Sequence, residues 1–284
     1  MTPRVYAKRV LDLIERRALY ADRVDWPVVR ARLLAAADGA VAPGELHEAL
    51  DVVAQEAGGA HSRLLPPDTV RHLADSLSQL PEARVVDGTG VLVLPTCSGD
   101  RRRRRAYALA GGRALGLLPP VRGWVVDLRG NGGGSMWPML AVAAPILRGD
   151  GVIGAFVDRD GGRIPWRLRR GRVGTGWRPQ ARSNGPSELP GPVAVLTDGG
   201  TASSGEAVAV AFRGLPRVRS YGAATYGFST ANESFPMPDG ARLLITGARF
   251  ADRTGAVYDG PVTPDTEVAD GDALPVALAG LTRH

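Results

Sequence analysis

A serine in this chain lies in a setting that is typical of a nucleophile. The run Thr-Ala-Ser-Ser-Gly-Glu at residues 201–206 follows an apolar segment that we expect to be a strand, residues 193–197, and precedes an Ala- and Val-rich segment that we expect to be a helix. A serine at such a helix N-terminus is exposed, and the helix dipole favours negative charge on a substrate oxygen there. The alternative is structural: Thr201 or Ser203 caps the helix and Glu206 completes a capping box.

A glycine-rich turn could supply the matching electrostatic group. A second apolar run, at residues 124–128, is followed by Arg-Gly-Asn-Gly-Gly-Gly at residues 129–134. Consecutive glycines expose backbone N–H groups with no Cβ in the way, and such groups can stabilise a developing oxyanion. The alternative is a tight turn that needs positive φ angles. The spacing does not match the G-x-G-x-x-G of a dinucleotide-binding turn.

A histidine could act as the base. His61 and Ser62 lie in a glycine-rich turn, and a neutral imidazole with a pKa of about 6.5 suits proton transfer near neutral pH. A histidine on a loop is more often incidental than catalytic, so His61 is a candidate on this ground alone. Lysine is excluded as a base in the interior of the chain, because Lys8 is its only lysine.

Composition excludes several classes of site and partner. Cys97 is the only cysteine, which excludes a disulfide scaffold and a multi-cysteine zinc or iron-sulfur site, and we expect no metal and no cofactor. The formal net charge is +6, but the basic residues are nearly all arginine, which indicates a coding bias, and no nucleic-acid partner is expected. The arginine run at residues 101–105 is interpreted as the solvated first turns of a helix, with an acidic-substrate patch or a nucleic-acid contact as alternatives.

The surrounding elements indicate an α/β protein. Apolar residues at helical spacing predict a small helical bundle over the first 57 residues, and further helices are expected at 68–80 and 101–116. Short apolar runs typical of buried strands lie at 91–94, 124–128, 152–157, 193–197, 217–221 and 243–246. Residues 159–190 predict a hairpin or a long active-site loop. We therefore expect a helical domain at residues 1–80, which carries His61, and an α/β core at residues 81–284.

No segment predicts export or membrane insertion. No apolar run approaches the roughly 18 residues of a spanning helix, and charged residues interrupt the N-terminal apolar runs. The expected location is the cytoplasm, with no membrane partner, and the oligomeric state stays open.

Four motifs in one order resemble those of the tail-specific, or C-terminal processing, serine peptidases. They are Asp-Leu-Arg-Gly-Asn-Gly-Gly-Gly at 127–134, Thr-Ala-Ser-Ser-Gly-Glu at 201–206, Gly-Ala-Ala-Thr-Tyr-Gly at 222–227 and Asp-Gly-Pro-Val-Thr-Pro-Asp at 259–265. The resemblance implies a Clp-protease/crotonase-like ββα core behind an N-terminal helical bundle. Many members of the family carry a PDZ domain before the core, but residues 63–125 leave no room for one.

The resemblance also implies which residues act. In the C-terminal processing branch the base is a lysine just after the third motif, a position that is Phe228 here. The chain is more similar to the Ser-His branch, which includes the tricorn core, nisin-resistance proteins and retinoid-binding-protein-like repeats. That branch has a Gly-x-His-Ser sequence, which residues 59–62 match. The implied nucleophile is Ser203 and the implied base is His61.

Further site residues follow from the same resemblance. Gly133, or Gly132, and Ser204 would supply the backbone N–H groups of an oxyanion hole. Asp259 occupies the position of the branch's glutamate, one methylene shorter, and would orient His61 directly or through Ser62. The predicted function is a serine endopeptidase that acts on peptides or unfolded protein tails. The alternative is a binding protein that retains the peptidase fold without proteolysis.

Overall fold

The computed structural model describes residues 1–75, 79–176, 178–269 and 271–282, which fall into two compact units. Unit 1 consists of Met1–Ser76, Asp158–Gly162 and Thr230–Ala248, and unit 2 consists of Leu77–Val157, Arg163–Ser229 and Arg249–His284. Unit 1 thus takes in two segments that the sequence analysis placed with the core. Each unit is described in turn.

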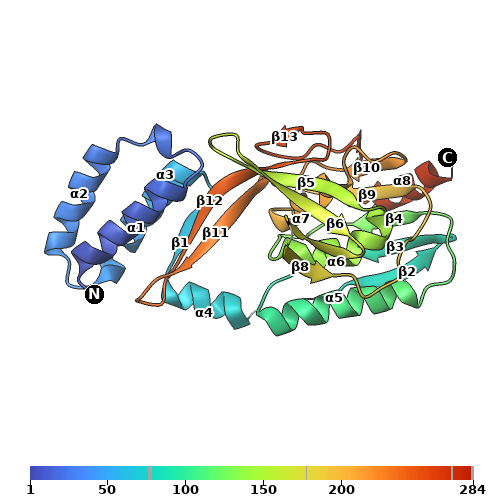
Figure 1. Cartoon of the computed structure of the whole chain (residues 1–284), viewed down its shortest axis with the longest axis horizontal. Coiled ribbons are helices and arrows are strands. Elements are labelled where there is room, and N and C mark those ends of the chain that lie inside the picture. Colours follow the sequence, from blue (N-terminus) through green and yellow to red (C-terminus); the bar gives the residue numbers. More distant parts are fainter. Residues whose placement is uncertain (76–78, 177, 270, 283–284) are drawn as a thin grey trace. The chain divides into compact units, whose positions relative to one another are not determined.

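Three amphipathic helices form the N-terminal part of unit 1 (Figure 1). They are α1 (Pro3–Arg17), α2 (Trp26–Gly39) and α3 (His47–Gly58), with short 3-10 turns at Ala21–Arg23 and Pro43–Leu46. Side-chain oxygens cap the first two helices, since Thr2 accepts a hydrogen bond from the backbone of Val5 and Asp25 accepts one from Val28. The predicted helical bundle is confirmed. The helix predicted at 68–80 is observed as α4 (Pro67–Asp75), and residues 76–78 of that prediction lie outside the described residues.

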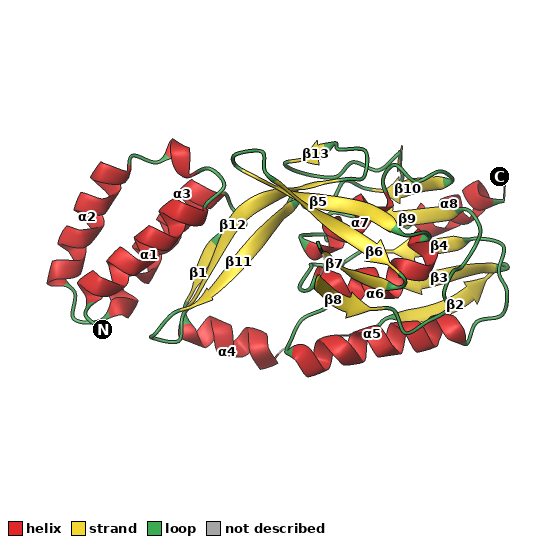
Figure 2. Ribbon diagram, in the orientation of Figure 1, coloured by secondary structure: helices red, strands yellow, loops and turns green. Residues whose placement is uncertain are grey.

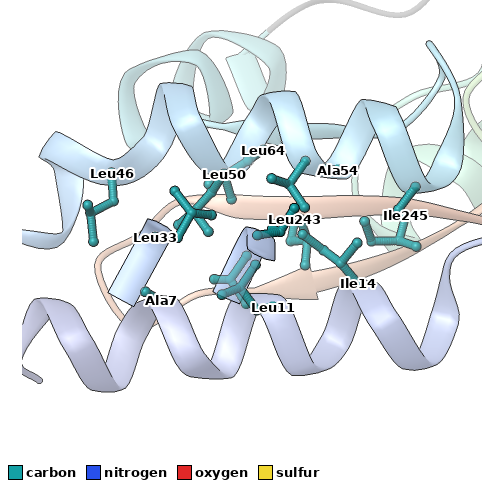
Figure 3. Packing of buried hydrophobic residues seen from close by; sticks show 14 of the residues in the cluster. Ala7, Leu11, Ile14, Leu33, Leu46, Leu50, Ala54, Leu64, Leu243 and Ile245 are labelled. Carbon is teal, nitrogen blue, oxygen red and sulfur yellow. The ribbon is translucent and has the colours of Figure 1, made fainter. Parts of the chain in front are cut away.

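The helices of unit 1 share their core with strands from a distant part of the sequence. Strand β1 (Arg63–Leu65) pairs antiparallel with β12 (Arg242–Ala251), and β11 (Thr230–Pro236) also pairs with β12. Leu243 and Ile245 of β12 are fully buried, and they lie between α1 and α3 in Figure 3. The β11–β12 hairpin, as far as Ala248, is therefore part of unit 1 and shares its core.

Unit 2 is built on a mainly parallel sheet of six strands in the order β14-β10-β9-β4-β3-β2 (Figure 2). All neighbours run parallel except β2, which is antiparallel to β3. The strands are β2 (Glu82–Val86), β3 (Thr89–Val93), β4 (Trp124–Asp127), β9 (Val193–Thr197), β10 (Val218–Gly222) and β14 (Thr266–Glu267). Strands β4 and β9 are buried at every residue, which explains the continuous apolar runs of the sequence. The predicted α/β fold class is confirmed.

Four helices occur in the described part of unit 2. They are α5 (Arg101–Gly116), α6 (Met136–Leu147), α7 (Ser204–Phe212) and α8 (Ala273–Leu281). Helix α5 has the predicted bounds, and its five leading arginines are exposed, as expected of a solvated first turn. Helix α6 was not predicted. It is buried along nearly its whole length, and a helix that is apolar on all sides lacks the 3.6-residue periodicity that reveals a surface helix.

The segment after α6 forms an antiparallel meander. It consists of β5 (Gly151–Asp158), β6 (Arg163–Arg169), β7 (Arg172–Thr175) and β8 (Arg178–Arg182). Of the two interpretations of residues 159–190, the hairpin is therefore confirmed and the long loop is not. Residues 163–182 contain seven arginines, all exposed, and no acidic residue. The remainder of the chain has one more acidic than basic residue. The net positive charge therefore belongs to the meander and is not spread over the fold.

A further short strand, β13 (Val257–Tyr258), pairs antiparallel with the end of β12. Among the described residues, no helix combines the length and the apolar character needed to cross a bilayer.

Replacement of Leu243 tests whether β12 belongs to the helical core. We expect Leu243→Ala to destabilise unit 1 by about 2–5 kcal/mol, because it leaves a cavity beside α1 and α3. Val41→Ala is the control, since Val41 is 90% exposed and should change stability by less than about 0.5 kcal/mol. Amide hydrogen exchange of α1 and α3 measures the effect, and equal protection in both variants would contradict the shared core.

Candidate active site

Ser203 has an unusual backbone conformation. It is the N-cap residue of α7, with φ at 53° and ψ at −114°, whereas N-cap residues normally adopt the β region. A positive φ is uncommon for a residue with a Cβ, costs about 1–3 kcal/mol, and recurs at active sites where neighbouring contacts enforce it. The side chain of Ser203 is half-buried. This conformation favours the nucleophile interpretation over helix capping alone.

The hydroxyl of the neighbouring Ser204 is already engaged in a hydrogen bond. Ser204 is buried, and its hydroxyl donates a hydrogen bond of 2.8 Å to the carbonyl of Gly134. The hydroxyl of Ser204 is therefore committed to the glycine-rich turn. Of the two adjacent serines, Ser203 is the one whose side chain is accessible.

A buried carboxylate stabilises the turn that carries Ser203. Glu206 is fully buried, and its Oε2 accepts a hydrogen bond of 2.7 Å from the backbone N–H of Ser203. This contact is the glutamate half of the predicted capping box. Burial raises the pKa of Glu206, and hydrogen bonds to its carboxylate, first that from Thr225, counteract part of the rise.

The same carboxylate joins the third and fourth motifs. Its Oε1 accepts hydrogen bonds from the hydroxyl of Thr225 at 2.5 Å and from the N–H of Gly227 at 3.0 Å. The hydroxyl of Thr225 in turn accepts from the N–H of Val262 at 2.8 Å. Ser229 lies between Oε1 of Glu206, at 3.3 Å, and the carbonyl of Gly260, to which it donates at 2.5 Å. The motifs that are far apart in the sequence thus meet at one side chain.

The glycine-rich turn packs directly against Ser203. Gly133 has a φ of 106°, and a Cβ at this position would lie 2.9 Å from the Cβ of Ser203 and 3.1 Å from the nitrogen of Ser204. Only glycine fits this close approach. The turn is therefore adjacent to the serine, as an oxyanion hole requires.

The backbone N–H groups of the predicted oxyanion hole differ in their availability. Among the described residues, the N–H of Ser204 has no hydrogen-bond acceptor. The N–H of Gly133 donates to Oδ1 of Asn131, and the N–H of Gly132 donates to Oγ1 of Thr96, each at 2.9 Å. Ser204 is thus the member of the predicted set that is ready to receive a substrate oxygen.

His61 belongs to unit 1, where a hairpin residue contacts its ring. It follows Gly59, which has a φ of 79°, and its Nδ1 lies 2.9 Å from Oγ1 of Thr230 at the start of β11. Asn232 of the same strand donates a hydrogen bond of 2.9 Å to the carbonyl of His61. Burial lowers the pKa of His61 to about 4, so its imidazole is neutral at pH 7. A neutral imidazole can accept a proton.

Ser62 makes a buried hydrogen bond within unit 1. It is fully buried, and its hydroxyl accepts a hydrogen bond of 3.0 Å from the N–H of Thr246 on β12. A Cβ at Gly58 would lie 2.0 Å from this hydroxyl, so the turn also requires glycine at position 58. The contact ties the His61 turn to β12.

Asp259 lies in unit 2, where its Oδ2 accepts a hydrogen bond of 2.7 Å from Nε of Arg249. This carboxylate is 44% exposed. The structure thus pairs Asp259 with an arginine, while the role of Asp259 or Ser62 in orienting His61 stays a prediction.

Sequence reasoning missed the contacts that Thr230 and Asn232 make with His61. Both residues are about 170 positions away in the sequence, and a threonine in a strand carries no motif. Thr225 and Gly227 lay within a quoted motif, but their shared contact with Glu206 was not foreseen. No group of three or more His, Cys, Asp or Glu side chains suited to a metal ion occurs among the described residues.

Removal of the buried carboxylate should destabilise unit 2. In Glu206→Ala the N–H groups of Ser203 and Gly227 and the hydroxyl of Thr225 lose their acceptor. Each buried donor without an acceptor costs about 1–3 kcal/mol, so we expect a loss of about 3 kcal/mol or more. Denaturant titration measures it against Glu82→Ala, which removes an exposed glutamate of β2. Equal stability of the two variants would show that Glu206 does not organise the unit.

The lowered pKa of His61 predicts a pH-dependent stability. Above pH 6.5 this residue is neutral in the folded and in the unfolded protein. As pH falls from 6.5 towards 4, the unfolded chain binds the proton first, so its contribution to stability decreases and then levels off. His61→Gln removes this contribution. Unfolding free energies of the two proteins should therefore converge or cross only below pH 6.5, whereas parallel curves would contradict burial of the neutral imidazole.

Comparison with known proteins identifies the family of the chain. The family model described as Peptidase family S41 matches residues 89–268. The nisin-resistance protein of Lactococcus lactis subsp. lactis is 29% identical over 267 residues, which are 94% of this chain and 83% of that protein. The structure of a lipoprotein from Streptococcus agalactiae matches with a TM-score of 0.85 and 28% identity, over 100% of this chain and 97% of that one. A photosystem II D1 C-terminal processing protease shares the fold, with a TM-score of 0.64 and 16% identity over 100% of this chain and 97% of that one.

The match to the family model covers more than half of the chain and includes the glycine-rich turn, Ser203 and Glu206. The resemblance noted from the motifs is confirmed. The chain belongs to peptidase family S41 and is a serine-type peptidase.

Proposed function

We propose that the chain is an endopeptidase that cleaves peptides or protein C-terminal tails, with Ser203 as the nucleophile and His61 as the general base. The observation that carries this proposal is the strained conformation of Ser203 at the N-terminus of α7. The hydroxyl of Ser203 is accessible, the N–H of Ser204 has no acceptor among the described residues, and the glycine-rich turn lies directly against Ser203. These are the parts that acyl transfer needs.

The proposed reaction has two halves. The Oγ of Ser203 attacks the peptide carbonyl carbon while an imidazole nitrogen of His61 takes the hydroxyl proton, and the N–H of Ser204 stabilises the oxyanion. His61 returns the proton to the leaving amine as the C–N bond breaks, which leaves an acyl-enzyme on Ser203. Water then loses a proton to His61 and attacks the ester, and the proton returns to Oγ as the acid product leaves.

The proposed substrates follow from the relatives. One similar protein is a nisin-resistance protein and another is a protease that processes the C-terminus of a photosystem II protein, so a peptide or an extended protein tail is the proposed substrate class. The expected cytoplasmic location stays a prediction, because one similar chain is described as a lipoprotein. A binding protein that retains the fold would lack a reactive Ser203, so the following experiment separates the two functions.

Replacement of the nucleophile tests the proposal. The wild-type protein should cleave members of a panel of nisin and extended peptides and should react with a fluorophosphonate probe at one serine, identified by mass spectrometry. Ser203→Ala should lose at least about 1,000-fold in kcat and should not react with the probe. Ser187→Ala, which changes an exposed serine of unit 2, is the control. Equal cleavage by wild type and Ser203→Ala would refute the assignment, and an unreactive wild type would favour the binding protein.

A further inference from the structure

We propose that Thr230 is the positioning residue of His61, and that its neutral hydroxyl serves where a Ser-His-Asp triad uses a carboxylate. The inference deepens the proposed function and rests on it. It starts from the 2.9 Å contact between Oγ1 of Thr230 and Nδ1 of His61.

The contact has a rigid support. Thr230 is 7% exposed and begins β11, which pairs with β12. β12 is fixed in turn by Leu243 and Ile245, which are fully buried among the helices of unit 1. Threonine is β-branched and has few side-chain conformations, so its hydroxyl has a defined place. A group that orients a catalytic side chain needs this kind of support.

The backbone of the His61 turn is fixed by other residues of the same hairpin. Asn232 donates to the carbonyl of His61, and the hydroxyl of Thr246 donates to Oδ1 of Asn232 at 2.7 Å. The N–H of Thr246 donates to the hydroxyl of Ser62. These bonds set the position of the turn and leave the rotation and the tautomer of the imidazole ring undetermined. The contact with Thr230 acts on the ring itself.

The contact is compatible with the tautomer that a base requires, and we propose that this tautomer is the active one. A hydroxyl oxygen can accept a hydrogen bond from the protonated Nδ1 of His61, and the lone pair then lies on Nε2. Nε2 is thereby the nitrogen that would take the proton of Ser203. When the imidazole becomes charged, Nδ1 keeps its proton and its bond to Thr230, so the ring does not have to turn between the two halves of the reaction.

A hydroxyl differs from a carboxylate in one measurable respect. A carboxylate stabilises the imidazolium electrostatically and raises the pKa of the histidine strongly, whereas a neutral hydroxyl that accepts from Nδ1 orients the ring and stabilises the imidazolium much less. The pKa of His61 is lowered by burial to about 4, in keeping with a partner of this kind. The base is therefore oriented and still neutral at pH 7.

The experiment compares Thr230→Val, which removes the hydroxyl at nearly constant volume, with Thr230→Ser, which keeps it. On a peptide cleaved by the wild type, Thr230→Val should lower kcat about 10- to 100-fold, with KM within about twofold. The acid limb of its kcat/KM profile should move to lower pH, since the imidazolium loses a hydrogen-bond acceptor. Thr230→Ser should recover activity to within about threefold of wild type.

A matched variant separates positioning from packing. Thr246→Val removes another buried threonine hydroxyl from the same hairpin, so it should lower thermal stability about as much as Thr230→Val without moving the acid limb. The inference is overturned if Thr230→Val matches the wild type while His61→Ala is inactive, or if Thr230→Val and Thr230→Ser are impaired alike. If His61→Ala or Ser203→Ala cleaves as well as the wild type, the proposed function itself is wrong, and that outcome is distinct from the other two.

Discussion

The turn that carries Ser203 depends on the fully buried carboxylate of Glu206. Glu206 has no exposed surface, and a charge in such a place is tolerated only when donors surround it. Those donors come from Ser203, Thr225 and Gly227, so α7 and the loop after β10 must come together around it. The strained backbone of Ser203 is one consequence, because its N–H is directed at the carboxylate. The strain at Ser203 is thus offset by hydrogen bonds in the interior.

In unit 1, neutral groups hold the turn that carries His61 in place. The turn that carries His61 is fixed by hydrogen bonds from Asn232 and Thr246, and its ring contacts Thr230. All three residues lie on the β11–β12 hairpin, which enters the core of the N-terminal helices. Thr230 follows Ser229 directly in the chain, and Ser229 is a neighbour of Glu206. Consecutive residues therefore contact His61 in one unit and Glu206 in the other.

Much of the fold could be predicted because hydrophobic periodicity and turn residues, which are local patterns in the sequence, mark its helices and strands. Helix α5 and strand β9 have the predicted bounds, since periodicity and flanking turn residues mark both ends. Helix α6 was not predicted, because a helix buried on every side lacks the 3.6-residue hydrophobic periodicity. The high net charge was attributed to coding bias. The arginines of residues 163–182 are visible in the sequence, but only the structure places them on the paired strands β6–β8.

The sequence by itself determined the family, the absence of a Ser-Lys pair and the candidates Ser203 and His61, because these depend on residue types and on short motifs. The tertiary structure decided which groups support them. Gly133 contacts Ser203, the N–H of Ser204 is available while that of Gly133 bonds to Asn131, and Thr230 contacts His61. Such contacts join residues up to 170 positions apart, and they arise from strand pairing and burial. Neither strand pairing nor burial leaves a local signal in the chain, which is why Thr230, which lies in no motif, could be found beside His61 only in the folded protein.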